Sequence, residues 1–339
     1  MSSAALDRLL AVLLAALAIT GIVSLWFGSP DGTWLFVVHA LLAGTLATAV
    51  VLKLRRSLPR AIGARRWRPL VIAALVTVVS IASLAAGYAW AAAGAPIWVG
   101  VGPIGSWTLL TLHAWLGIVL LPVVVVHLLP RRWRLLRPGR DAMRRSTGKL
   151  LSRRALLAGG GLAVASIGAY GTAAIVDRLR GGDRRFTGSR TLTDGGIPIS
   201  TTFFGEPAPS IDPAAWRLTV RGGTTAGEFT LDELRAMEPA ESTAVLDCTS
   251  GWALSTTWRG VPISTVLAAA GIGTVRRVEV RSLTGWSTSL DASELDRCLL
   301  AWSVAGQPLP LANGAPIRLV APDRRGLEWV KWVGEIRAA

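Results

Sequence analysis

Apolar residues in the first half of the chain are gathered into five long and nearly uninterrupted runs. Each run approaches the ~20 residues that an α-helix needs to cross the hydrocarbon core of a bilayer. The runs are Leu6–Phe27, Trp34–Leu54, Leu70–Ala93, Trp107–Leu129 and Ala155–Val176. This pattern predicts an N-terminal all-α transmembrane bundle of five helices.

The pattern changes after Asp177 to short alternating runs that are separated by Gly, Pro, Asp and Thr. Such alternation is typical of strands, and about 160 residues are enough for a domain with its own core. The expected boundaries are 1–130 for four transmembrane helices, 131–154 for a basic cytoplasmic loop, 155–176 for the fifth helix, 177–198 for a linker and 199–339 for a second, β-rich domain.

Composition supports the membrane assignment, and the distribution of charge orients it. The chain is 51% hydrophobic with a net charge of +15. The segment Lys53–Arg68 holds seven Lys or Arg and no acid, and Arg131–Arg154 holds ten Lys or Arg and one acid. The loops Gly28–Thr33 and Gly94–Ser106 contain no Lys or Arg. Short basic loops stay in the cytoplasm. We therefore expect a cytoplasmic N-terminus, a multi-pass protein of the cell membrane and an extracytoplasmic C-terminal domain.

The basic excess does not indicate a nucleic-acid partner, although the isoelectric point is about 11.4. Residues 177–339 contain 18 basic and 18 acidic side chains, so the C-terminal domain is formally neutral. A nucleic-acid-binding domain would carry its own basic patch. The excess charge therefore reports membrane topology, and we expect no nucleic acid among the partners.

The segment before the fifth helix reads "SRRALLAGGGLAVASIGAYG" and begins with paired arginines, Arg153 and Arg154. Paired arginines followed by leucines and a moderately apolar, glycine-rich stretch resemble a twin-arginine export signal. The alternative is that both arginines are further positive-inside charges. If the signal is used, the twin-arginine translocation machinery carries the last domain across already folded around a cofactor.

The chain contains two cysteines, and an exported domain raises a disulfide between them as the first interpretation. Cys298 lies in the apolar "LDRCLLAW", where a thiol usually serves as inert packing. Cys248 ends the strand-like "STAVLDC" and opens a Thr-Ser-Gly turn, so its thiolate could be a nucleophile or a soft metal ligand. All three histidines precede residue 177, which disfavours a nucleophile that needs a base. A lone thiolate suits a metal whose other ligands come from an organic cofactor.

Six motifs in order resemble the sulfite oxidase-like molybdopterin oxidoreductases, most closely the exported methionine-sulfoxide reductase type. The resemblance covers Ile199–Ala339 and implies an α+β molybdopterin-binding domain with mixed β-sheets. It also implies that Cys248 is the molybdenum ligand and the catalytic residue. The motifs are "FFGEPAPSIDPAAWRLTVRG", "LDCTSGW", "TTWRGVPISTVLAAAGI", "GWSTSL", "LLAWSVAGQPLPLANGAPIRLVAP" and "GLEWVKWVGEI".

The same resemblance implies which residues bind the molybdopterin. An Arg fork, a Lys and free backbone amides are suited to its phosphate. Ser282 stands where the family often has Thr, and Thr201 and Phe204 stand in an early stretch whose usual Asn is missing here. The arginines Arg324 and Arg325 are left open between a solvated turn and phosphate contact. The implied cofactor-binding residues are Asn313, Arg318, Trp329, Val330, Lys331, Ser282, Thr201 and Phe204.

Histidine inside a membrane span is costly and is a candidate for function. His39 and His113 fall at similar depths on the second and fourth helices, as a bis-histidine haem b requires. The alternative is that they only hydrogen-bond between helices. His127 lies roughly 21 Å deeper, but the matching position is Lys53, so we expect an interfacial residue and a single haem. The helices loosely resemble membrane cytochromes of the b561 and ferric-reductase kind.

These observations predict a single-chain membrane enzyme, a molybdopterin-dependent oxidoreductase. Electrons from a quinol or another membrane donor would pass through the haem to molybdenum on Cys248 and reduce a small or protein-bound sulfoxide or similar oxide. The Ig-like dimerisation domain of sulfite oxidases does not follow in the sequence, so we expect a monomer. Trp252 and Trp258 are expected either to shape an apolar pocket or to be core.

Three alternatives stay open at this point. The first is a sulfite-oxidising enzyme, which needs a cationic pocket for its anionic substrate, although Arg259 is the obvious cation near Cys248 in sequence. The second is a metal-free, membrane-anchored binding module of the same fold. The third is a membrane half that binds no haem and serves only as an anchor.

Overall fold

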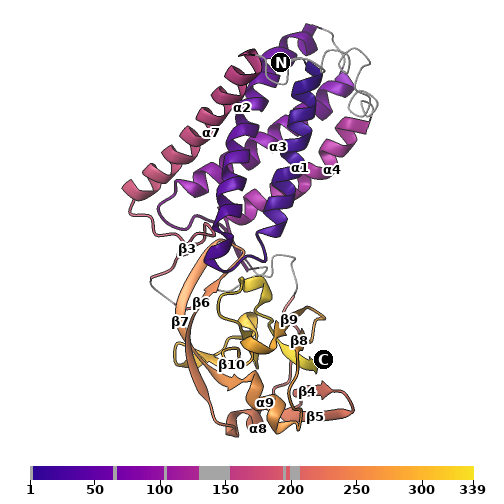
Figure 1. Cartoon of the computed structure of the whole chain (residues 1–339), viewed down its shortest axis with the longest axis vertical. Helices are drawn as coiled ribbons and strands as arrows, with labels where there is room; N and C mark the ends of the chain where they lie inside the picture. Colours follow the sequence, from indigo (N-terminus) through magenta and orange to yellow (C-terminus); the bar gives the residue numbers. More distant parts are fainter. Residues whose placement is uncertain (1–2, 64–66, 103–104, 130–152, 194–195, 199–206) are drawn as a thin grey trace. The chain divides into compact units, whose positions relative to one another are not determined.

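A computed structural model describes residues 3–63, 67–102, 105–129, 153–193, 196–198 and 207–339 (Figure 1). The chain forms two compact units. The helical unit comprises Met1–Ser24, Asp31–Ile97 and Leu109–Phe186. The β unit comprises Leu25–Pro30, Trp98–Thr108 and Thr187–Ala339.

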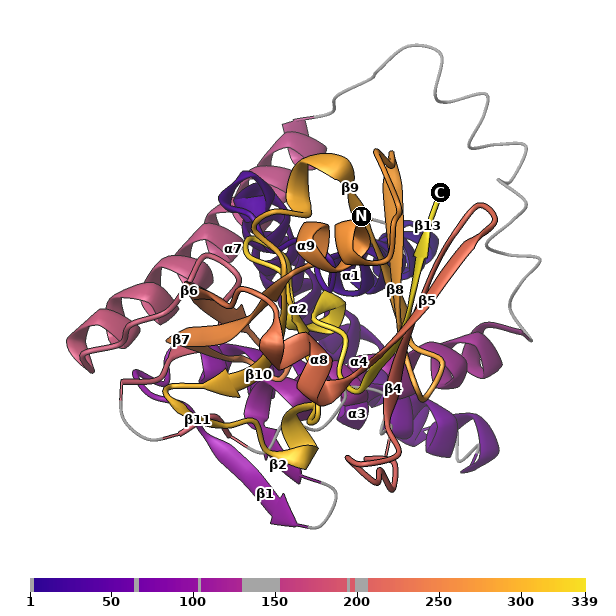
Figure 2. The ribbon, with the colours of Figure 1, turned by 90° about the horizontal axis from the view of Figure 1, so that it is seen from below.

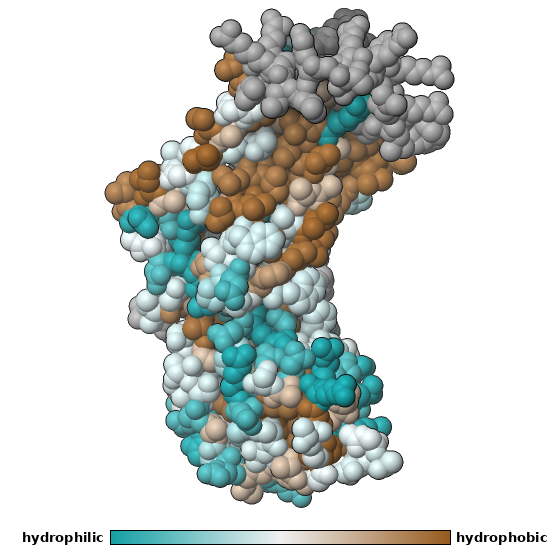
Figure 3. Space-filling view, viewed as in Figure 1, coloured by the Kyte–Doolittle hydropathy of each residue, from teal (hydrophilic) through white to brown (hydrophobic). Residues whose placement is uncertain are grey.

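The helical unit confirms the prediction of five membrane-length helices. Within the described residues, five helices are long and apolar enough to cross a membrane, judged by length and composition. Large apolar side chains are exposed along them, as Val12, Val71 and Val164 illustrate and as Figure 3 shows. The helices are α1 (Ser3–Val23), α2 (Thr33–Gly63), α3 (Trp67–Ala91), α4 (Leu109–Leu128) and α7 (Arg153–Leu179).

Two helix ends differ from the apolar runs that predicted them. α1 stops at Val23 rather than Phe27, and Ser24 Oγ donates to the carbonyl of Gly21 over 2.7 Å, which satisfies one acceptor of the last turn. α2 continues past Leu54 to Gly63, with Pro59 inside the helix. The Arg and Leu residues of this stretch are good helix formers. The twin arginines Arg153 and Arg154 form the first turn of α7.

Small and hydroxyl residues allow α2 and α7 to approach each other closely. A Cβ at Gly44 would lie 2.8 Å from the Cα of Ser166. One residue further on, Thr45 Oγ1 and Ser166 Oγ are 2.8 Å apart and share a hydrogen bond. Close backbone approach and interhelical hydrogen bonds are the main forces between helices in lipid, where the hydrophobic effect gives no drive.

The end of α7 is joined to the end of α3 by polar contacts. The buried carboxylate of Asp177 accepts from the amide of Gly94 over 3.0 Å. The Arg180 guanidinium donates to the carbonyl of Ala92 over 3.0 Å, and that of Arg184 to the carbonyl of Ala91 over 3.3 Å. These donors satisfy carbonyl groups at the end of α3 that have no partner within the helix.

The structure differs from the predicted linker at 177–198. Its first part, up to Phe186, belongs to the helical unit, and Thr187 onward belongs to the β unit. Arg190–Thr191 form strand β3, which pairs in parallel with Trp252 and Ala253. Arg190–Thr191 are a strand because they pair with β7, more than sixty residues later in the chain. The sequence around Arg190 does not indicate this pairing.

The β unit contains a mixed five-stranded sheet in which β4 and β13 run parallel and the other neighbours run antiparallel. Burial alternates along β4, where Leu218 and Val220 are buried and Arg217 and Arg221 are exposed. The order is β5 (Thr225–Thr230), β4 (Arg217–Gly222), β13 (Val333–Ala338), β8 (Arg277–Ser282) and β9 (Ser287–Asp291).

A six-stranded sheet supplies the other half of this core. Its centre is the long pair β6 and β7, and Figure 2 shows these strands on the other side of α8 (Leu231–Ala236) and α9 (Ile263–Ala269) from β4 and β8. The mixed sheets with short helices confirm the predicted α+β class. The strands are β3, β6 (Ala240–Asp247), β7 (Trp252–Pro262), β10 (Leu299–Val304), β11 (Gln307–Pro308) and β12 (Arg318–Val320).

The segment Gly94–Ser106 was expected as a loop, but an antiparallel hairpin of β1 (Trp98–Gly102) and β2 (Gly105–Thr108) begins within it. β2 extends into the predicted fourth helix, so α4 starts at Leu109 rather than at Trp107. This hairpin belongs to the β unit. The hydroxyl of Thr108 donates to the carbonyl of Ser250, so the hairpin contacts the turn that follows Cys248. Glycines interrupt the alternation of apolar and polar residues in both strands. For this reason the sequence pattern did not predict the hairpin.

Gly260 shows how tightly β7 packs against β10. A Cβ at this position would lie 2.2 Å from the carbonyl oxygen of Leu300 and 2.6 Å from the Cα of Ala301. We expect Gly260→Ala to destabilise the chain by about 1–3 kcal/mol through overpacking. Thermal unfolding of the full chain in detergent measures this. Gly273→Ala, which meets no atom within 4 Å, is the control, and equal melting temperatures would contradict the prediction.

Candidate functional site

The tight turn between β6 and β7 positions Cys248. The amide of Cys248 donates to the carbonyl of Trp252 over 2.9 Å, and the amide of Gly251 donates to the carbonyl of Cys248 over 2.9 Å. Gly251 has a φ of +95°, a conformation that favours glycine. The thiol is 7% exposed. The sequence predicted this strand-then-turn placement.

The carboxylate of Asp247, one residue before Cys248, is enclosed by three donors. Its Oδ1 accepts from Arg325 over 2.7 Å and from Ser189 Oγ over 2.6 Å, and its Oδ2 accepts from Thr187 Oγ1 over 2.8 Å. All four side chains are buried. We call this set of Asp247, Arg325, Thr187 and Ser189 the Asp247 clamp. Sequence reasoning missed it, and the only signal was a charged residue inside the apolar run "AVLDC".

The clamp also excludes one of the two interpretations of Arg325. Its side chain is only 3% exposed and pairs with Asp247, so the solvated-turn interpretation is wrong for this residue. Arg324 is not a free surface charge either, because it pairs with Glu294 over 2.7 Å and with Glu328 over 2.6 Å. These ion pairs account for Arg324 as a structural residue.

Arg318 lies between two buried indole rings. Its Cζ is 5.2 Å from the ring centroid of Trp258 and 5.6 Å from that of Trp329, distances at which a cation is attracted to an aromatic face. The guanidinium donates to the carbonyl of Asn313 over 3.0 Å and to that of Trp329 over 3.3 Å. The contact brings together three of the residues that the family resemblance implied.

Asn313, Val330 and Lys331, which the resemblance also implied, lie close in sequence to Arg318 or Trp329. Asn313 and Val330 are each 1% exposed. The Lys331 ammonium donates to the carbonyl of Ala312 over 3.3 Å. Gly314, with a φ of +115°, allows the chain to pass between Arg318 and Lys331, because a Cβ there would meet both within 3.1 Å.

Ser282 lies beside this closing segment. It pairs with Val333 across β8 and β13, and the amide of its neighbour Leu283 donates to the carbonyl of Trp332 over 2.8 Å. Its hydroxyl is 2.8 Å from that of Thr284. Thr201 and Phe204 lie outside the residues that the structure describes.

The burial of Cys248 favours a neutral thiol when no metal is bound. Burial raises the pKa of Cys248, and the hydrogen bonds from Ser250 and the charge of Arg325 act in the opposite direction. Burial also lowers the pKa of Arg318 to about 10, while a thiolate at Cys248 would raise it. Arg318 therefore stays charged at neutral pH, close enough to Cys248 to stabilise a metal-bound thiolate.

The donor set fits an anionic, metal-bearing cofactor. Among the residues described, the Nε atoms of Arg318 and Arg325 are buried without a hydrogen-bond partner. Buried polar atoms are normally satisfied, and a guanidinium fork suits a phosphate. A buried thiol beside two such arginines matches the chemistry of a phosphate-bearing cofactor whose metal takes a thiolate ligand.

Trp252 and Trp258 are core residues, each 0% exposed. Trp258 Nε1 donates to the carbonyl of Ala244, and its ring meets that of Trp329 edge-on with 5.4 Å between the centroids. These side chains support the Arg318 guanidinium from the protein interior. They do not line an open pocket of their own.

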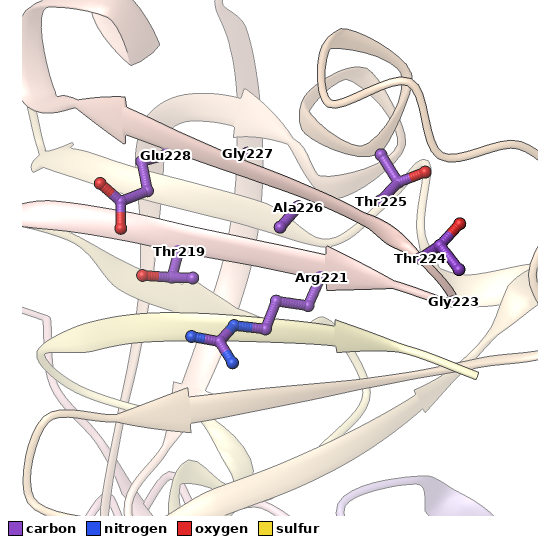
Figure 4. Close-up of a pocket in the computed structure, with 8 residues that line it drawn as sticks. All are labelled: Thr219, Arg221, Gly223, Thr224, Thr225, Ala226, Gly227 and Glu228. Atoms are coloured by element: carbon purple, nitrogen blue, oxygen red, sulfur yellow. The ribbon is translucent and has the colours of Figure 1, made fainter.

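A shallow cavity of about 390 Å³ lies elsewhere, over the hairpin of β4 and β5. Figure 4 shows Thr219 and Arg221 on β4 beside Glu228 on β5. The Arg221 guanidinium is 3.7 Å from the carboxylate of Glu335. None of the residues that the sequence singled out lines this cavity, so it is not part of the candidate site.

Cys298 is a free, fully buried thiol, and Cys248 is free as well, so no disulfide joins them. Burial, with the charge of Glu294 acting in the same direction, raises the pKa of Cys298 from 9.0 to about 12. The stability that this shift contributes is present below pH 9.0 and is lost as the pH rises towards 12, because the unfolded chain ionises first.

We therefore expect Cys298 to resist alkylation by iodoacetamide up to about pH 9, since the thiolate is the reactive form. Mass spectrometry of the modified peptide measures the reaction. The same residue should react when the chain is unfolded in denaturant, which serves as the control. Rapid modification of Cys298 in the folded chain would contradict the prediction.

The two predicted membrane histidines lie together in the helical unit. The imidazoles of His39 on α2 and His113 on α4 have centroids 6.2 Å apart, with an angle of 89° between the rings. Thr20 on α1 contacts the first ring, and Ser83 on α3 contacts the second. Four helices thus surround the pair. His127 is in the last turn of α4, fourteen residues from His113 along the same helix.

Comparison with known proteins identifies the C-terminal part of the chain. Residues 205–339 match the family described as the oxidoreductase molybdopterin binding domain. Mouse mitochondrial sulfite oxidase is 31% identical over 182 residues, 43% of this chain and 33% of that protein. A protein-methionine-sulfoxide reductase catalytic subunit of Xanthomonas campestris is 30% identical over 151 residues, 38% of this chain and 47% of that protein.

A further relative is a putative protein-methionine-sulfoxide reductase subunit of Azospira oryzae. It is 28% identical over 141 residues, covering 40% of this chain and 54% of the relative. The chain thus spans between a third and about half of the length of these three curated relatives. The match of residues 205–339 agrees with the molybdopterin-binding domain that the motifs predicted for this part of the chain, and the three relatives carry the names of oxidoreductases.

Proposed function

We propose that this chain, whose residues 205–339 form an oxidoreductase molybdopterin binding domain, is a membrane-anchored molybdenum enzyme that reduces a sulfoxide or a similar oxide. Its electrons pass through one haem b in the helical unit. The observation that carries this proposal is the buried thiol of Cys248 beside the guanidinium groups of Arg318 and Arg325. The named sulfoxide reductases among the relatives support the choice of substrate class.

The residues of the β unit divide the task of holding the cofactor. Cys248 provides the thiolate ligand to molybdenum. Arg318, Lys331 and Asn313, with the backbone of Trp329–Val330, would hold the phosphate and the pterin. The bound metal supplies two-electron oxygen-atom transfer, and the protein supplies position and electrostatics.

The chain's own contribution around Cys248 is rigidity and exclusion of water. The Asp247 clamp fixes the backbone next to the ligand and holds the Arg325 guanidinium by an ion pair. Trp258 and Trp329 hold the Arg318 guanidinium in a low-dielectric setting, where its charge acts more strongly than in water. The positive charges of Arg318 and Arg325 would stabilise a metal-bound thiolate at Cys248.

In the helical unit, His39 and His113, whose ring centroids are 6.2 Å apart, would hold the haem iron. Histidines inside membrane spans commonly serve in redox or proton transfer, and the bundle interior is a usual place for cofactors. A quinol or another membrane donor supplies the electrons. The positive-inside rule and the twin-arginine motif support an extracytoplasmic β unit that is exported with its cofactor installed.

Sulfite oxidation is the second candidate function. Arg318 and Arg325 give Cys248 a more cationic environment than Arg259 alone would, and cationic sites attract anionic substrates. Sulfite oxidase is also among the relatives. Turnover of methionine sulfoxide with an artificial reductant favours the first function, whereas turnover of sulfite alone with an artificial oxidant would replace it by the second.

Metal analysis and a pyridine haemochrome assay of the detergent-purified chain test the proposal. We expect equimolar molybdenum and haem b. His39→Ala and His113→Ala should each lose the haem and keep the molybdenum, because the ligands to each cofactor lie in different units. His127→Ala is the control and should keep both. Molybdenum without haem in the unmodified chain would reduce the helices to an anchor, and the absence of molybdenum would overturn the enzyme assignment.

A further inference from the structure

The hydrogen bonds of His113 define one tautomer of its imidazole. Its Nδ1 lies 2.8 Å from the backbone carbonyl oxygen of Ser83. A carbonyl oxygen only accepts hydrogen bonds, so Nδ1 must carry the proton. The lone pair of this imidazole is therefore on Nε2, the nitrogen free to bind a metal.

The tautomer of His39 follows from the hydroxyl group of Thr20. Thr20 Oγ1 is 2.8 Å from the carbonyl oxygen of Ala16 and 3.2 Å from that of Leu17. A hydroxyl has one proton to donate, and these helix carbonyls take it. Towards His39 Nδ1, which is 2.8 Å away, Thr20 can then only accept. His39 also carries its proton on Nδ1 and its lone pair on Nε2.

The separation of the rings suits one metal ion between them. Metal–imidazole bonds of about 2 Å, extended on each side to the ring centre, give about 6 Å between centroids. The observed distance between the centroids of His39 and His113 is 6.2 Å. The two imidazoles thus combine matching tautomers with a matching spacing.

Glycines on the flanking helices provide the room for both rings. A Cβ at Gly87 would lie 2.9 Å from His113 Nδ1 and Cε1, and a Cβ at Gly21 would lie 3.4 Å from His39 Cε1. Gly87 is four residues from Ser83 on one face of α3, and Gly21 follows Thr20 on α1. Each flanking helix therefore supplies a hydrogen-bond acceptor and a close backbone contact to one imidazole.

We propose that Thr20 is a positioning residue for His39, which fixes the tautomer and orientation of this haem ligand and tunes the haem. The inference rests on the proposed haem function. An acceptor at Nδ1 makes an imidazole a stronger donor to iron, and a stronger donor favours the ferric state. The hydroxyl of Thr20 therefore lowers the reduction potential of the haem. Ser83 does the same for His113 through its backbone, which no side-chain substitution removes.

Thr20→Val tests this role, because it removes the hydroxyl and keeps the branched shape. We expect the variant to bind haem about 10–100-fold more weakly and the haem that remains to have a higher reduction potential in a spectroscopic redox titration. Thr20→Ser restores the hydroxyl and should behave as the unmodified chain does. Molybdenum content and elution on gel filtration check that the full chain is folded.

Thr48→Val is the matched control, because the hydroxyl of Thr48 donates to the carbonyl of Gly44 within the same helix. Equal haem retention and equal potential in Thr20→Val and Thr48→Val would overturn the role of Thr20 while leaving the haem assignment intact. An unmodified chain without haem b, or His39→Ala with undiminished haem, would overturn the proposed function and this inference together. The two failures are therefore distinguishable.

Discussion

Cys248→Ser is expected to empty the β unit of molybdenum and to abolish oxidoreductase activity while the chain still folds. A serine hydroxyl at this buried position does not ionise, and its oxygen is a harder ligand than a thiolate. Changes to residues that merely orient a metal ligand cost about 10–100-fold, so loss of the ligand itself should cost more than about 100-fold. Molybdenum content and sulfoxide turnover of the purified full chain measure both effects.

The same substitution at the second cysteine is the control for this experiment. Cys298 is fully buried like Cys248, but it packs among apolar residues and faces no unsatisfied arginine. Cys298→Ser should lower stability through its buried hydroxyl and leave molybdenum and activity near their normal levels. If Cys248→Ser keeps normal molybdenum and activity, Cys248 is not the ligand and the proposed site is wrong.

Asp247→Asn is expected to be the most destabilising polar substitution in the β unit. The change keeps the shape of the side chain but leaves the Arg325 guanidinium buried without its counter-charge. The two side chains are only 2% and 3% exposed, so solvent screens the pair little. Breaking a buried ion pair by removing one partner costs about 3–5 kcal/mol. Denaturant unfolding of the full chain in detergent measures the loss.

A surface pair of similar geometry provides the comparison. Arg297 and Asp323 are 3.0 Å apart, as short as many buried pairs, but their side chains are 49% and 64% exposed. Asp323→Asn should therefore cost less than about 1 kcal/mol. The double variant Asp247→Asn with Arg325→Met should lose less than the sum of its single changes, because neither charge is then left alone. Equal losses in Asp247→Asn and Asp323→Asn would show that the Asp247 clamp does not hold the Cys248 turn.

The clamp explains why the segment before the matched domain belongs to the site. Thr187 and Ser189 precede residue 205, where the family match begins, yet both donate to the carboxylate next to Cys248. The two hydroxyls and Arg325 all donate hydrogen bonds to the buried carboxylate of Asp247. Buried charges are normally paired and hydrogen-bonded, and residues before the matched domain supply two of these three donors.

The sequence by itself determined the five membrane helices, the α+β class and the turn that holds Cys248. Lipid offers no hydrogen-bond partners to the backbone, so each spanning segment must be helical and must show itself as an apolar run. The family motifs lie within residues 199–339, where the chain is locally constrained by turns and alternating strands. For the same reason candidate residues from Asn313 to Lys331 could be proposed from short motifs that resemble those of the family.

Only the tertiary structure decided which distant groups meet. Thr187 and Asp247 lie sixty residues apart in the sequence, and nothing in either local pattern predicts the other. The burial of Arg325, the hairpin β1–β2 and the contact of Thr20 with His39 likewise depend on pairings between separate elements. Hydrophobic periodicity reports which face of an element is buried, whereas the partner of a buried polar group is fixed by packing across the whole domain.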